Sequence, residues 1–253
     1  MFSDKVVCIA GASHGIGRSL AEAFAREGAS LLMLSRSKHV SAPDDCIGRA
    51  DAIVMQCDVS DYQNVQDAIA SALARWGRID ILINAAAILG PTGELWKSDP
   101  QEWLSTINTN LVGTYNTIRA ALPGMIERQD GKIINFAGGG AAYAYPRFSA
   151  YAASKAAVVR LTETVAAECL PHNISINVIA PGAIETRMLR SVREAGGEVR
   201  TVGTMDQVVD IVFFLASVRG VSISGRFLHA KDDYRVLTAG MPPDLYTLRR
   251  VQP

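Results

Sequence analysis

The stretch that decides the fold is "KVVCIAGASHGIGRSLAEAFAREG", residues 5–28. Its first part, residues 5–10, is apolar and rich in β-branched residues, which predicts a buried strand. Its last part, residues 18–28, has helical spacing and closes on a glycine, a common residue after a helix. The segment between them, "GASHGIG" (11–17), therefore joins a strand to a helix through a glycine-rich turn.

Such a turn is suited to binding phosphate. Glycine lets the backbone turn sharply and approach a ligand, and the following helix offers free N–H groups and a partial positive pole. Glycines alone are weak evidence, but a place between a strand and a helix is the context that the motif requires. We therefore predict that a pyrophosphate is bound by Gly11, Ser13, His14, Gly15, Ile16 and Gly17.

Short apolar runs and longer helical runs alternate along the rest of the chain. Nearly continuous apolar runs are typical of strands that are buried on both faces of a parallel sheet. We predict an α/β fold, a single-domain, Rossmann-type doubly wound parallel sheet of about seven strands flanked by helices. The expected strands are 5–10, 30–35, 51–59, 79–85, 132–137, 174–180 and 225–230. The expected helices are 18–28, 61–76, 101–128, 149–170 and 205–217.

Composition narrows the class of protein. The 253 residues, of which 49% are hydrophobic, suit one large domain over 1–253, with 231–253 as a C-terminal tail. Lys and Arg number 25 and Asp and Glu number 25, with no basic run, so no nucleic-acid partner is expected. No signal segment or apolar stretch of ~18 residues predicts a membrane contact. Four scattered cysteines indicate a reduced, cytoplasmic setting and no metal site.

The end of the second expected strand bears on the cofactor. An acidic residue there would bind the ribose hydroxyls of NAD, whereas a basic one would accept the 2′-phosphate of NADP. This chain has Ser35 followed by Arg36, and a guanidinium can form a forked pair with a phosphate. We therefore expect NADP, with NAD still possible, and a weak second contact from His14.

Five motifs in order give the chain a family resemblance. They are the glycine turn, Asp58-Val59, "NAAA" (84–87), Asn110 in "NTNLVGTY", and "YAASK" (151–155) with "PGAIET" (181–186) after it. Over about residues 4–230 the chain resembles the short-chain dehydrogenase/reductases. The resemblance implies a nicotinamide-dependent oxidoreductase, in which Asn110 would hold a water that links Lys155 to solvent. It implies further cofactor contacts at Asp58, Val59, Asn84, Ala85, Lys155, Pro181, Gly182, Ile184 and Thr186.

Tyr151 and Lys155 match the catalytic pair of that family and can do proton chemistry on their own account. They are four apart on an expected helix, so both side chains lie on one face. A nearby ammonium favours the phenolate and would lower the pKa of Tyr151 from its usual value near ~10. Tyr151 could then act as a general acid toward a carbonyl or a general base toward an alcohol.

One group of the family pattern is missing. The resemblance places a serine thirteen residues before the tyrosine, and here that position is Gly138. Losing one oxyanion donor costs roughly 10²–10³ in rate. Another hydroxyl could substitute, backbone N–H groups of the glycines could bind the oxyanion, or hydride transfer could be lost. The candidates for the first two explanations are Ser149, Tyr143, Tyr145, Gly138 and Gly139.

The leading hypothesis is thus an NADP(H)-dependent oxidoreductase that interconverts a carbonyl and an alcohol on a small molecule. The alternatives are a weakened nucleotide-binding or assembly protein, and non-redox chemistry such as a lyase or epimerase step. Segment 187–204 is expected to be a short lid that leaves the pocket mouth wide or mobile, and its arginines Arg187, Arg190 and Arg193 could meet an anion. The resemblance also implies a homodimer or homotetramer, joined through 101–128 and 149–170.

Overall fold

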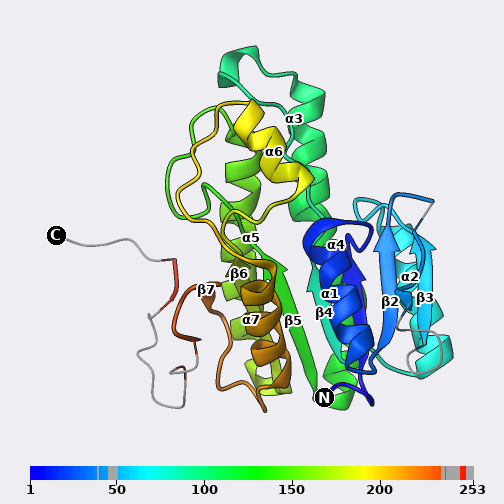
Figure 1. Cartoon of the computed structure of the whole chain (residues 1–253). Coiled ribbons are helices and arrows are strands. Elements are labelled where there is room, and N and C mark those ends of the chain that lie inside the picture. The colour runs from blue at the N-terminus through cyan, green and yellow to red at the C-terminus, as the bar shows by residue number, and fades with distance from the viewer. Residues whose placement is uncertain (39, 45–50, 235–236, 238–245, 249–253) are drawn as a thin grey trace.

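The computed structural model describes residues 1–38, 40–44, 51–234, 237 and 246–248. Seven parallel strands form one sheet in the order β3-β2-β1-β4-β5-β6-β7, with helices on both faces (Figure 1). The predicted doubly wound parallel sheet is thereby confirmed. The strands are β1 (Val6–Ala10), β2 (Ser30–Ser35), β3 (Ala52–Gln56), β4 (Ile81–Asn84), β5 (Gly131–Phe136), β6 (Ile174–Ala180) and β7 (Phe227–His229).

The long helices divide between the two faces of the sheet. Buried side chains of α1 and α7 share one apolar cluster, and those of α2, α4 and part of α5 share another on the opposite face. The first strand shows why its sequence is apolar throughout: Val7 and Ile9 lie in the first cluster, and Val6 and Cys8 in the second. The helices are α1 (Gly15–Arg26), α2 (Tyr62–Trp76), α3 (Pro100–Ile107), α4 (Gly113–Arg128), α5 (Ser149–Cys169), α6 (Arg187–Glu194) and α7 (Met205–Ser217).

The order of strands reverses between β1 and β4, which are neighbours although β2 and β3 lie between them in sequence. In open α/β sheets ligands bind at this switch point, outside the carboxyl ends of the strands. The turn after β1 must therefore be compact. A Cβ on Gly11 would lie 2.6 Å from the Ala86 nitrogen, and one on Gly17 would lie 2.3 Å from the Gly11 oxygen. Only glycine fits at either position.

The expectation of one continuous helix over 101–128 is wrong. It is divided into α3, a π-helical segment η3 (Asn108–Val112) and α4. A π-helical turn inserts an extra residue into a helix and is frequent at functional sites. Asp99 begins α3, because its carboxylate accepts hydrogen bonds from the N–H groups of Gln101 and Glu102. Two short 3₁₀ segments, η2 (Leu95–Lys97) and η4 (Leu170–His172), were also not expected.

The described part of the tail packs against the body of the protein. Tyr234 and Leu237 are buried in the cluster formed by α1 and α7. The Tyr246 carbonyl accepts a hydrogen bond from the N–H of Phe227 in β7. Most of the expected tail 231–253, and Cys46, lie outside the described residues. Within the described ranges, no helix is both long and apolar enough to cross a membrane.

A chain of buried polar side chains ties the middle of the sheet to α4 and α5. Thr117 Oγ1 donates to Asn84 Oδ1 at 2.6 Å, and Asn84 Nδ2 donates to Asn135 Oδ1 at 2.9 Å. Asn135 Nδ2 in turn donates to Thr162 Oγ1 at 2.9 Å. Asn135 and Thr162 are fully buried, so each bond replaces one that water would otherwise supply.

We predict that Asn135→Leu lowers the free energy of unfolding by roughly 1–3 kcal/mol, because it leaves the amide of Asn84 buried without a partner. Urea denaturation of the variant measures the loss. The same measurement on Asn84→Leu and on the double variant completes a cycle, in which the double variant should lose less than the sum of the two. Additive losses would mean that the two amides do not act together.

Candidate active site

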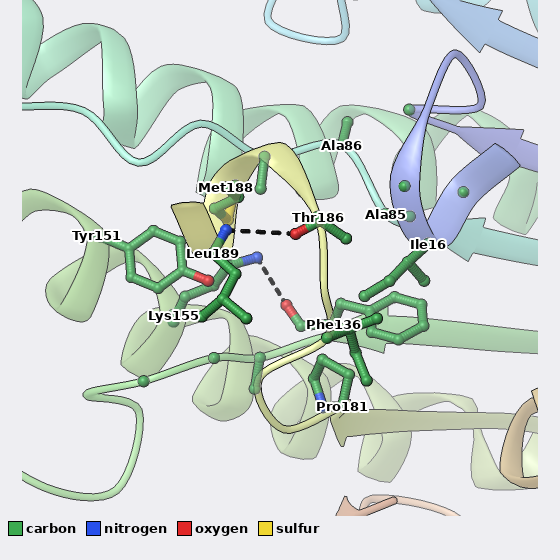
Figure 2. Close-up of a pocket in the computed structure, with 18 of the residues that line it drawn as sticks. Ile16, Ala85, Ala86, Phe136, Tyr151, Lys155, Pro181, Thr186, Met188 and Leu189 are labelled. Carbon is green, nitrogen blue, oxygen red and sulfur yellow. Dashed lines mark hydrogen bonds between the residues drawn. The ribbon is translucent and has the colours of Figure 1, made fainter. Parts of the chain in front are cut away.

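A cavity of about 750 Å³ lies at the carboxyl ends of the strands. Residues that follow six of the strands line it, so strands far apart in sequence bring their first loop residues to one place (Figure 2). These residues are Gly11 after β1, Arg36 after β2, Cys57 after β3, Ala85 after β4, Ala137 after β5 and Pro181 after β6. The helices α3 and α6 stand beyond this end of the sheet (Figure 1).

Tyr151 lines this cavity from the first turns of α5. Its side chain is only 8% exposed, and its ring packs in a cluster with Phe148 and Val192. Among the described residues no group hydrogen-bonds the Tyr151 hydroxyl. The hydroxyl is therefore held in position by packing and is free to bond with a ligand in the cavity.

Lys155 lies one helical turn further along α5 and also lines the cavity. Its Nζ donates a hydrogen bond to the Phe136 carbonyl at 2.8 Å and lies 5.8 Å from the centre of the Tyr151 ring (Figure 2). Burial lowers the pKa of Lys155 to about 8. The ammonium is thus directed at the end of β5, and it loses its proton more easily than an exposed lysine.

The expected lowering of the Tyr151 pKa is wrong for this structure. Burial raises the pKa of the Tyr151 phenol, and the neighbouring Tyr145 and Tyr143 raise it further. Lys155 is not among the groups that shift the pKa of Tyr151. The hydroxyl therefore keeps its proton near neutral pH, which suits a general acid better than a general base.

Asn110 does not line the cavity, although it lies close to the pair. It is fully buried in η3, and its amide exchanges two hydrogen bonds with the backbone of Ile88 and donates a third to Ser154 Oγ. These bonds connect the loop after β4 to α5 beside Lys155. The observed contacts give Asn110 a positioning role, and its link to a water stays a prediction.

The candidates for replacing the missing hydroxyl are Ser149, the two tyrosines and the glycine N–H groups. They differ in whether they line the cavity and in whether they already have a hydrogen-bond partner. Ser149 does not line the cavity, and its Oγ accepts a hydrogen bond from Trp103 Nε1 at 3.2 Å. Tyr143 and Tyr145 do line it, but the Tyr145 hydroxyl donates to the Glu198 carbonyl at 3.2 Å. The turn after β5 also contributes to the lining, and within the described part of the chain no hydrogen bond uses the N–H groups of Gly138 and Gly139.

Two of the expected cofactor contacts lie elsewhere. Asn84 is buried in the polar chain within the sheet. The Asp58 carboxylate accepts both the N–H and the hydroxyl of Ser60, and Asp58 lines a small hollow next to the main cavity together with Arg36. The remaining expected contacts all line the cavity: Gly11, Ser13, His14, Gly15, Ile16, Gly17, Arg36, Val59, Ala85, Lys155, Pro181, Gly182, Ile184 and Thr186.

The glycine turn fits a diphosphate. No side chain caps α1, so the N–H groups of its first turn remain available to an anion. A Cβ on Gly15 would meet no group closer than the Thr186 side chain at 3.4 Å, so the backbone is open on that side. Three cationic or titratable side chains, His14, Arg36 and Arg187, line the same end of the cavity. Burial, Arg187 and Arg36 together lower the pKa of His14.

The helical part of the lid packs against the body of the protein, and the expected wide or mobile mouth stays a prediction. Thr186 begins α6 by accepting a hydrogen bond from the N–H of Leu189 (Figure 2), and Val192 packs on Phe148 beside Tyr151. Of Arg187, Arg190 and Arg193, which were expected to meet an anion, only Arg187 lines the cavity, and the lid also contributes Arg200 to the lining. Arg193 is paired with Glu185 at 2.9 Å, and Arg190 is exposed.

Sequence reasoning missed His229, which lines the cavity from the end of β7. Its Nδ1 accepts the N–H of Lys231, so the neutral ring carries its proton on Nε2. Nε2 lies 3.5 Å from where a Cβ on Gly182 would be. Its position at the carboxyl end of an apolar strand was the signal that could have found it.

Comparisons with known proteins agree with this geometry. The family model described as short chain dehydrogenase matches residues 5–197. A 3-oxoacyl-[acyl-carrier-protein] reductase of Thermotoga maritima is 32% identical over 236 residues, which cover 88% of this chain and 95% of that protein. The NADP-bound structure of ElxO has a TM-score of 0.78 at 28% identity, covering 89% of this chain and 96% of that one. An NAD⁺-bound xylitol dehydrogenase has a TM-score of 0.82 at 25% identity, covering 90% and 98%.

We predict that the buried Lys155 makes stability depend on pH. Its pKa of about 8 in the folded protein lies below its ordinary value of 10.5, so between these pH values the unfolded chain binds more protons. The free energy of unfolding should therefore rise across this window relative to that of Lys155→Met, by on the order of 3 kcal/mol in total. Denaturation of both proteins at pH values from ~7 to ~10 measures the difference, and a constant difference would contradict the prediction.

Proposed function

The chain belongs to the short chain dehydrogenase family, and we propose that it is an NADP(H)-dependent oxidoreductase that interconverts a carbonyl and an alcohol on a small molecule. Membership of this family makes the protein an oxidoreductase that acts on CH–OH or C=O groups. The observation that carries the proposal is the Tyr151 hydroxyl, which lies at the cavity without a hydrogen-bond partner in the described part of the chain. A phenol in that position can bond to a substrate oxygen.

Tyr151 acts as the general acid in the reducing direction. The hydride would come to the carbonyl carbon from a reduced nicotinamide cofactor, which the glycine turn, Arg36 and Arg187 would hold. The Tyr151 O–H bond breaks and its proton forms the new O–H bond of the alcohol, so that the phenol ends as a phenolate. Lys155, with its pKa near neutrality, stabilises that phenolate and takes part in returning a proton to it from solvent. In the oxidising direction the same proton moves back.

The cofactor proposal rests on charge at one end of the cavity. Arg36 directly follows β2, at the strand end where a 2′-phosphate would lie, and no carboxylate takes that place. Arg187 lies at the start of α6, beside the glycine turn, and forms no ion pair within the described ranges. Both support a cofactor with several phosphates, and they favour NADP over NAD.

The substrate proposal rests on the side chains at the end of the cavity that contains Tyr151. The side chains that pack around Tyr151 and line the cavity are apolar or aromatic, as Tyr145, Met188 and Val192 show. The guanidinium of Arg200 lies 4.2 Å from the centre of the Tyr143 ring and is paired with Glu198. These contacts favour an uncharged, largely apolar carbonyl compound. A homodimer or homotetramer joined through α4 and α5, and a cytoplasmic location, remain part of the proposal.

We predict that Tyr151→Phe lowers kcat by roughly 10²–10⁴, because it removes the proton donor and leaves the ring packing in place. The affinity for NADPH, measured by cofactor fluorescence, should stay within about twofold of the wild type. The variant is tested on a panel of apolar ketones that the wild type reduces. A variant that keeps wild-type turnover on such a ketone would contradict the proposed role of Tyr151.

We predict that two arginines make different contributions to cofactor affinity. Arg36→Glu should weaken NADPH binding about 10- to 100-fold and leave NADH binding unchanged or improved, because only NADPH carries the 2′-phosphate. Arg187→Glu should weaken the binding of both cofactors, since both carry the diphosphate. The matched control is Arg190→Glu, an exposed lid residue outside the cavity. Equal effects of all three variants would indicate general electrostatics only.

A further inference from the structure

The turn after β5 lies unusually close to α5, the helix that carries Tyr151. A Cβ built on Gly138 would lie 2.3 Å from the Tyr151 hydroxyl oxygen and 2.9 Å from Cζ of the same ring. Real Cβ atoms essentially never lie within 3.0 Å of a heavy atom outside their own and the adjacent residues. The phenol therefore lies in the space that any side chain at position 138 would need.

The backbone of Gly138 does not explain the glycine. Its φ is not in the left-handed region, whereas Gly140 in the same turn has a φ of +84°. The φ of Gly138 is therefore no reason for a glycine at this position. The requirement for glycine at this position comes from the neighbouring phenol.

Tyr151 has little room to move away. Its ring is buried with Phe148 and Val192, and the helix that carries it is packed against the same turn. A Cβ on Gly140 would lie 2.5 Å from the Ala152 Cβ, so α5 lies directly on the glycines. A side chain at 138 would thus have to displace the ring against the packed lid.

We propose that Gly138 is a positioning residue, whose bare Cα admits the Tyr151 phenol to the place of a side chain and so sets where the hydroxyl meets the substrate oxygen. The proposal rests on the function given above and deepens it. Gly138 thus has a role of its own in the active site, beyond the loss of a serine hydroxyl at this position. The free N–H groups of Gly138 and Gly139 remain at the cavity as additional donors.

A lost donor and a positioning glycine predict opposite results for Gly138→Ser. If the site only lacks a hydroxyl, restoring serine should raise kcat, by as much as roughly 10²–10³. If Gly138 gives the phenol its place, Gly138→Ser and Gly138→Ala should both lower kcat about tenfold or more, because a misplaced proton donor is inefficient. NADPH affinity should change by less than about twofold in both variants.

The experiment measures kcat, KM and NADPH affinity for the two variants in the full chain. Gly124→Ala is the control, since a Cβ there would meet nothing closer than Arg128 Nη1 at 3.4 Å and Gly124 does not line the cavity. It should leave all three quantities unchanged. A rise of kcat above the wild type in Gly138→Ser would overturn the proposal, and so would unchanged kcat in Gly138→Ala.

The melting temperature tests the contact between Gly138 and Tyr151 without a measurement of turnover. Gly138→Ala should lower the melting temperature by roughly 4 °C or more in the wild type. The loss should be clearly smaller in a Tyr151→Phe background, where the nearest clashing atom is absent. Equal losses in the two backgrounds would contradict the contact. If the wild type binds NADPH but reduces no carbonyl, the proposed function fails, while the melting cycle still decides the contact.

Discussion

The site depends on how closely α5 approaches the turn that follows β5. Three contacts define this approach: Gly138 beneath the Tyr151 hydroxyl, Gly140 against Ala152, and the Lys155 ammonium on the Phe136 carbonyl. A row of glycines makes the approach possible, because any side chain at two of these points would force the helix outward. The helix in turn fixes the phenol and the amine relative to the end of the strand. The Lys155 side chain is thus oriented by a bond to the backbone, and the Tyr151 ring by packing against its neighbours.

The rest of the cavity divides into a charged end and an apolar end. The glycine turn, Arg36 and Arg187 form the charged end, and the rings around Tyr151 form the apolar end. The lid spans both, since Thr186 lies against Gly15 and Val192 packs beside Tyr151. A helix that contacts both ends can sense a cofactor at one and a substrate at the other.

Much of the fold could be predicted from sequence, because burial on both faces leaves a plain signal. The expected ranges 30–35, 174–180 and 205–217 agree with β2, β6 and α7. The long helix over 101–128 could not be resolved, because the break at η3 coincides with bonds from Asn110 to the distant Ile88. No local pattern shows a contact of that kind.

The sequence predicted which strand-end residues line the cavity. It predicted less well their hydrogen-bond partners and the pKa of Tyr151. Asn84 and Asp58 lie outside the lining of the cavity and bond to Asn135 and Ser60, partners that spacing does not indicate. Ser149 is engaged by Trp103 for the same reason. The pKa of Tyr151 was expected to fall, since charge is visible in a sequence while depth of burial is not.

The central claim is that the Tyr151 hydroxyl, seated over Gly138, gives its proton to a carbonyl beside the nicotinamide ring. A crystal structure with NADPH and an unreactive substrate analogue tests it most directly. The account predicts an analogue oxygen roughly 2.6–3.2 Å from Tyr151 Oη, with the adjoining carbon about 3–3.5 Å from C4 of the nicotinamide ring. A ring bound remote from Tyr151, or an analogue oxygen held by other groups, would contradict it.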